Sequence, residues 1–177
     1  MKHVISAFCY IALCSTPGFT QSEAVTGPAM TDQQFIDFAA QVDMIEANLG
    51  QLAQSVSPSQ SIKDYAQMLV TDHTKEFNQL YDIARQAGLM RPNAIDAAHN
   101  KMMIDPFQKL KGEPFDHRYI QEMVNGHTKA IAVYKKESAD AENPALKSYA
   151  EQVLPILQKH LDEAKVLQKS KTAPKDM

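Results

Sequence analysis

Apolar residues recur at spacings of three and four along almost all of residues 31–168, a periodicity typical of amphipathic helices. The first periodic stretch covers residues 31–56, with Thr31 or Asp32 available as the N-cap. Its apolar positions follow a heptad pattern: Phe35, Phe38, Val42, Ile45, Leu49, Leu52 and Val56. No stretch keeps the alternation with period two that is typical of β-strands. The pattern therefore predicts an all-α fold.

Three further helices are predicted, at residues 59–87, about 116–139 and about 144–168. Ser59 is placed to cap the second helix, and Gly88 is placed to end it as a left-handed glycine. Asp116 is the expected N-cap of the third helix, and Pro144 is the expected first residue of the fourth. Pro155 lies inside the fourth pattern and should bend that helix.

The connections between these helices differ in length. The first and the last are short, whereas residues 88–115 form a long connection between the second and third helices. This connection has helical signals of its own, in Asn93–Met103 and in a turn that begins at Asp105 and ends at Gly112. A long crossover makes the second and third helices run parallel. The predicted architecture is therefore a ferritin-like four-helix bundle.

Each predicted long helix carries one polar residue at or beside its apolar face: Glu46, His73, His127 and His160. Counted from the two short connections, the two residues of each hairpin differ in depth by about one turn, or about 6 Å. Long side chains can converge across such an offset. Burying three imidazoles and a carboxylate without partners would cost several kcal/mol, which a shared cation would offset. These four residues are the predicted ligands of one metal ion.

A second interpretation keeps the same helices without a metal. The three histidines and Glu46 would then form a buried hydrogen-bonded network. In that case the protein would be a structural or protein-interaction bundle at the cell envelope. The positions of the polar residues in the sequence are compatible with both interpretations.

Four neighbouring residues are weaker candidates for the same site. Glu76 shares the face of the second-helix histidine and is either its partner or a solvated flank, and Glu163 is expected to be solvated. Asp72 faces away from the second-helix histidine and is expected to make a surface or crossover contact. Met123, one turn before the third-helix histidine, is the one methionine placed to offer a soft ligand.

The two ends of the chain differ from the periodic region. Residues 1–24 have the pattern of a cleavable secretory signal peptide, with a basic start, a short apolar run and small residues at 20–24. The expected location is therefore periplasmic. Cys14 follows Leu13 in a partial match to a lipoprotein signal, which leaves peripheral or lipid-anchored association with the outer membrane open. Residues 169–177 are the expected flexible tail.

Charge, cysteine content and the absence of known motifs reduce the number of functions expected for this chain. The net charge of −3 and the scattered carboxylates give no reason to expect nucleic-acid binding. Cys9 and Cys14 are the two cysteines and fall within the predicted signal peptide, so the mature chain would offer no thiolate ligand or disulfide. No nucleotide-binding loop or serine-hydrolase motif supports an enzyme, but an open coordination position on the metal would permit hydrolytic or redox chemistry. An envelope protein partner or a homo-oligomer remains open.

Four segments carry a resemblance to a known family: FIDFAAQVDMIEANLGQLA, YAQMLVTDHTKE, GEPFDHRYIQEMVNGHTKA and LPILQKHLDEAKVL. Together they resemble an exported bacterial family with a ferritin-like four-helix fold and no defined function, whose members are often labelled outer membrane proteins. The resemblance covers about residues 33–168. It implies that Glu46, His73, His127 and His160 are the positions to carry over. Where the family has Asp before the third-helix histidine, this chain has Gly126.

Di-iron ferritin-like proteins combine two glutamates with two Glu-x-x-His motifs. In this chain the residues three before His73 and His160 are Val70 and Leu157, so both bridging glutamates are missing and a ferroxidase centre is not expected. Three imidazoles and a carboxylate suit one transition-metal ion, with zinc and iron leading and copper and manganese as further candidates. The leading hypothesis is a periplasmic bundle that acts in metal handling or envelope stress protection.

Overall fold

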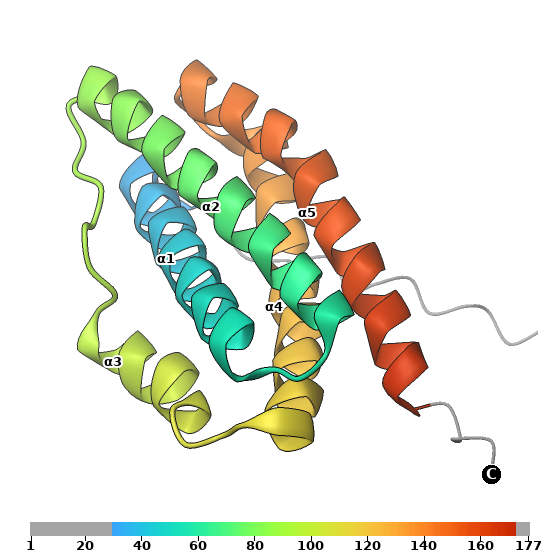
Figure 1. Ribbon diagram of the computed structural model, residues 1–177. Coiled ribbons are helices and arrows are strands. Elements are labelled where there is room, and N and C mark those ends of the chain that lie inside the picture. The colour runs from blue at the N-terminus through green and yellow to red at the C-terminus, as the bar shows by residue number, and fades with distance from the viewer. Residues whose placement is uncertain (1–29, 173–177) are drawn as a thin grey trace, which may run out of the picture.

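The structure is a computed structural model, and residues 30–172 are described (Figure 1). The predicted signal peptide and the end of the predicted tail lie outside these residues. Within them the regular elements are all helical: α1 (Asp32–Val56), α2 (Gln60–Ala87), α3 (Ala97–His99), α4 (Gly112–Asp140) and α5 (Pro144–Thr172). None of these helices combines the length and the apolar character needed to cross a membrane.

Several helix ends fall where the sequence predicts them. Thr31 is the N-cap of α1 and forms a capping box with Gln34, in which each side chain accepts a hydrogen bond from the backbone of the other residue. Ser59 is the N-cap of α2. Gly88 ends α2 with φ 69°, a left-handed conformation that glycine adopts without the steric cost of a Cβ atom.

The start of α4 differs from the prediction. The helix begins at Gly112, whose φ of 63° turns the chain into it, and Asp116 is a buried residue of the helix rather than its N-cap. The expected crossover helix is also shorter, because Asp96 caps α3 by accepting a hydrogen bond from the backbone N–H of His99 at 2.9 Å. A π-helical segment, Asn100–Ile104, and a 3-10 turn, Asp105–Phe107, follow α3.

The four long helices pack as two antiparallel pairs, α1 with α2 and α4 with α5 (Figure 1). The pairs meet where α2 contacts α5 and where α1 contacts α4. Figure 1 shows α2 and α4 running in the same direction, joined by the long segment that contains α3. This topology brings all four helices around one interior.

The interior contains two hydrophobic clusters, and buried polar residues separate them along α1, α2 and α4. On α1 the first cluster includes Ala40 and the second begins at Ile45, with Asp43 buried between them. On α4 the first cluster includes Ala130 and the second includes Met123, with His127 buried between them. The apolar layers therefore hold a polar layer at mid-height, where water is largely excluded.

The buried face of α1 is rotated from the predicted heptad face. Phe38 and Val42 are only partly buried, whereas Ala39, Ala40 and Asp43 are buried. The small side chains allow close contact between helices, so packing selects the face that carries them over the face with the larger apolar residues.

Candidate metal centre

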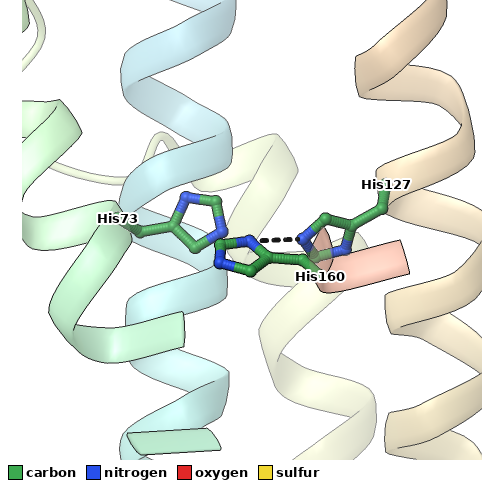
Figure 2. A group of neighbouring side chains, drawn as sticks. All are labelled: His73, His127 and His160. Carbon is green, nitrogen blue, oxygen red and sulfur yellow. Dashed lines mark hydrogen bonds between the residues drawn. The ribbon is translucent and has the colours of Figure 1, made fainter. Parts of the chain in front are cut away.

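The structure brings the four predicted polar residues together at mid-height of the bundle. His73, His127 and His160 are completely buried, and Glu46 is 5% exposed. One nitrogen from each of the three imidazoles lies within 4.8 Å of the others. Figure 2 shows the three rings converging from α2, α4 and α5. Each of the four long helices thus supplies one side chain to a common centre.

The distances between these side chains match the edges of a small coordination polyhedron. Glu46 Oε2 lies 3.3 Å from His73 Nε2 and 3.3 Å from His127 Nε2. His127 Nε2 lies 3.2 Å from His160 Nδ1. Ligands placed about 2.0–2.1 Å from a tetrahedral ion are about 3.3–3.4 Å apart. The three separations therefore fit ligands that surround one ion.

The outer nitrogens of two rings are held by hydrogen bonds. His127 Nδ1 donates to the carbonyl oxygen of Met123 at 2.9 Å, and His160 Nε2 donates to Asp72 Oδ2 at 2.9 Å. Both acceptors lack a proton to give, so the outer nitrogens carry the protons. The inner nitrogens, His127 Nε2 and His160 Nδ1, then direct two lone pairs at each other across 3.2 Å. Such an arrangement is repulsive unless a cation lies beside it.

The third ring, His73, has carboxylates on both sides. Its Nδ1 lies 3.0 Å from Asp43 Oδ1, to which it donates a hydrogen bond, and 3.3 Å from Glu76 Oε2. Its Nε2 forms an ion pair with Glu46 Oε2 at 3.3 Å, but neither of these buried atoms has a hydrogen-bond partner. Unpartnered buried polar atoms are costly, and here they point into the common centre.

The pKa values reflect this mixture of burial and charge. Burial lowers the pKa of His160 to about 4 and also lowers that of His127. Burial alone would lower the pKa of His73, but the surrounding carboxylates raise it well above its usual value. Burial opposes ionisation of Glu46, yet the three histidines lower its pKa, whereas burial raises the pKa of Asp43 to about 7. In the metal-free protein, His73 therefore carries the positive charge of the cluster.

Among the described residues, only histidines form ion pairs with Asp43, Glu46 and Glu76. These three carboxylates are almost completely buried, with 1%, 5% and 2% exposure. Burying carboxylates without matching positive charge is unfavourable. The centre is therefore rich in negative charge relative to the one protonated ring, as expected of a cation site.

Two cavities reach the centre from opposite sides of α1. A cavity of about 710 Å³ lies between α1, α4 and the crossover, and its lining includes Glu46 and Gly126. A smaller cavity of about 280 Å³ is lined by residues of α1 and α2 that include Asp43 and His73. A Cβ atom at position 126 would lie 3.2 Å from Glu46 Oε1, so the glycine makes room for this carboxylate.

The weaker candidates have mixed outcomes. Glu76 is a partner of His73, and Glu163 is half-exposed and lies 3.9 Å from a lysine on its own helix, as expected of a solvated flank. The expectation for Asp72 was wrong: α2 and α5 pack so that this carboxylate orients His160. Met123 contributes its backbone carbonyl to His127.

Sequence reasoning did not identify Asp43. Its signal was present, because Asp43 lies three residues before Glu46 and therefore on the same side of α1. The heptad pattern centres that helix on its larger apolar residues and leaves Asp43 outside the predicted core. The rotated face of α1 explains the omission.

Comparison with solved structures identifies the fold. CopM in the Cu(II)-bound form has a TM-score of 0.67 and 17% sequence identity, with 81% of this chain and 99% of that chain covered. CopM in the Cu(I)-bound form gives a TM-score of 0.69 at 16% identity, over 81% and 99% of the two chains. A DUF305 fragment from Deinococcus radiodurans gives 0.65 at 18% identity, over 80% and 99%. At these identities the similarity shows the fold alone.

Sequence comparison provides the family. No curated protein matches the chain. The model of a family described as "Domain of unknown function (DUF4142)" matches residues 17–167, which is most of the chain. The chain therefore belongs to the DUF4142 family.

Proposed function

We propose that this protein binds a transition-metal ion through Glu46, His73, His127 and His160 and acts in metal handling. The observation that carries the proposal is the pair of imidazole nitrogens, His127 Nε2 and His160 Nδ1, that face each other at 3.2 Å while their outer nitrogens donate to other groups. A cation bound by both lone pairs would turn this repulsion into coordination.

The surroundings of the rings support the same function. Histidine ligands of metal sites usually donate their second N–H to a carboxylate or a carbonyl, which fixes the ring and its tautomer. All three imidazoles follow this rule, with Asp43, Met123 and Asp72 as acceptors. In a network without an ion, Glu46 Oε2 and His73 Nε2 are joined by an ion pair at 3.3 Å and by no hydrogen bond.

Three nitrogen donors and one carboxylate suit Zn(II), Cu(II), Fe(II) or Mn(II), and affinity generally peaks at Cu(II) in this series. CopM, whose fold this chain shares, has been solved with Cu(I), Cu(II) and silver. Copper is therefore the first ion to test, followed by zinc. Iron oxidation at a di-iron centre is not part of the proposal, because the bridging glutamates are absent.

The proposal also assigns a setting to the protein. The two antiparallel pairs and the long segment between α2 and α4 support a ferritin-like bundle. The signal-peptide pattern of residues 1–24 supports export to the periplasm, where the metal handling would protect the envelope from stress. Fusion of residues 1–30 to a periplasm-dependent reporter tests export separately from metal binding.

Calorimetric titration of the metal-free mature chain with Cu(II) and with Zn(II) tests the binding site directly. The expected result is tight binding that His127→Ala weakens by at least 100-fold. His117→Ala is the matched control, because His117 is an exposed histidine of the same helix and should leave binding unchanged. Equal binding by the two variants would refute the site, and no binding by the unmodified chain would favour a structural bundle.

A further inference from the structure

We infer that a second divalent cation binds between Asp43, Glu76 and Nδ1 of His73, so that the His73 ring bridges two metal ions. The inference rests on the proposed function, because the first ion occupies the Nε2 side of the same ring. The second position is a separate set of donors. One atom from each of Asp43, His73 and Glu76 lies within 4.8 Å of the others.

The geometry of His73 makes the two positions distinct. Nε2 faces Glu46 at 3.3 Å, and Nδ1 faces Asp43 at 3.0 Å and Glu76 at 3.3 Å. The in-plane lone pairs of the two nitrogens point away from each other, so one ion cannot be bound by both. When a second ion replaces the proton on Nδ1, that proton leaves to solvent and the ring becomes an imidazolate with one lone pair for each ion.

Buried carboxylate oxygens without hydrogen-bond partners surround the second position. Glu76 is 2% exposed, and neither of its carboxylate oxygens has a hydrogen-bond partner. Asp43 is 1% exposed, and its Oδ2 is also unpartnered. To orient the His73 ring, Asp43 needs only the one oxygen that accepts the hydrogen bond from Nδ1. Glu76 has no role in the first position, and its ion pair with His73 at 3.3 Å involves only one of its two buried oxygens.

Charge balance favours two ions over one. Asp43, Glu46 and Glu76 contribute three negative charges to the buried layer when ionised, and one divalent ion would leave a net negative charge. Two divalent ions are neutralised when His73 is an imidazolate, because the ring supplies the fourth negative charge. Neutral buried clusters avoid the desolvation cost of an uncompensated charge.

The two positions are also reached through different cavities. The 710 Å³ cavity is lined by Glu46 and does not touch His73, whereas the 280 Å³ cavity is lined by Asp43 and His73 and does not touch Glu46. The smaller cavity offers space beside the second position for a water ligand. Three protein donors and a water would complete a four-coordinate ion.

Titration of the metal-free mature chain with Cu(II), followed by calorimetry and electron paramagnetic resonance, tests the inference. We expect two equivalents to bind, and the resonance signal per copper should fall as the second equivalent is added, because an imidazolate bridge couples the two ions magnetically. Glu76→Gln should bind one equivalent with an undiminished signal. Glu163→Gln, a partly exposed glutamate, is the matched control and should bind two.

The outcomes separate the two proposals. If the unmodified chain binds one equivalent and His127→Ala removes it, the second position is refuted and the first stands. If two equivalents bind without a loss of signal, the bridge is refuted whatever the behaviour of Glu76→Gln. If no copper or zinc binds tightly, the proposed function and the inference both fail. The signal of the unmodified chain decides the question even if Glu76→Gln does not fold.

Discussion

Gly126 and Glu46 form a close contact between α4 and α1, because a Cβ atom at position 126 would lie only 3.2 Å from Glu46 Oε1. The carboxylate would have to move by a few tenths of an ångström to accept such an atom. Glycine lowers the stability of a helix interior, so its presence in α4 is unfavourable for folding. The contact indicates that room for the carboxylate takes precedence over helix stability at this position.

Gly126→Ala should therefore separate stability from metal binding. We expect the free energy of unfolding of the metal-free chain to rise by up to about 1 kcal/mol, because alanine favours the helix. The displaced Glu46 carboxylate should weaken metal binding by roughly tenfold, or about 1.4 kcal/mol. Urea unfolding and calorimetric titration measure the two quantities.

Gly50→Ala provides the contrast for this variant. A Cβ atom at position 50 would lie 2.8 Å from Val70 Cγ2 and 3.0 Å from the backbone oxygen of Ala66. This clash involves the α2 backbone, so Gly50→Ala should lower the free energy of unfolding by about 1–3 kcal/mol. A Gly126→Ala variant that loses stability in the same way would contradict the role assigned to the Glu46 carboxylate.

Asp72→Ala should weaken metal binding without removing it. The Asp72 carboxylate accepts the hydrogen bond from His160 Nε2 at 2.9 Å, and this bond orients the ring. Loss of such an outer partner typically lowers metal affinity by about 10–100-fold. Calorimetry should give that loss with unchanged stoichiometry. Asp82→Ala removes an exposed carboxylate of the same helix and should have no effect.

The sequence contains most of the information for the fold and the centre of the site. Helical periodicity and turn residues predict the four long helices, including the caps at Thr31, Ser59 and Gly88. The four inward polar residues stand out because each interrupts an apolar face, and the structure brings them together. These features depend on local periodicity, which a single sequence records.

The outer partners depend on tertiary packing and were harder to predict. Asp72 contacts His160 because of the rotation of α2 against α5, which no local pattern encodes. Asp43 was missed because small residues set the buried face of α1. The position of Asp116 within a helix also escaped prediction, because a left-handed glycine at position 112 starts α4 one turn earlier.

Metal binding should stabilise the folded chain. A ligand that binds only the folded state at about 1,000 times its Kd adds about 4 kcal/mol to the free energy of unfolding. For a domain of this size the melting temperature should rise by roughly 10 °C. Scanning calorimetry with and without Zn(II) measures the shift, and a chelator should reverse it. His127→Ala should show a much smaller shift, whereas a shift in this variant equal to that of the unmodified chain would place the ion elsewhere.

The first metal equivalent should release about one proton at pH 7. His73 is protonated on both nitrogens at this pH, since its carboxylates raise its pKa well above the usual value, and a metal at Nε2 must displace one proton. His127 and His160 have lowered pKa values, are already neutral and release none. The affinity for the metal should therefore rise with pH up to the pKa of His73.

Calorimetric titrations in two buffers with different ionisation enthalpies measure the number of protons released. Asp43→Asn removes one of the carboxylates that hold this proton, so its release should be smaller. Release of three protons by the unmodified chain would mean that all three rings are charged before the metal binds.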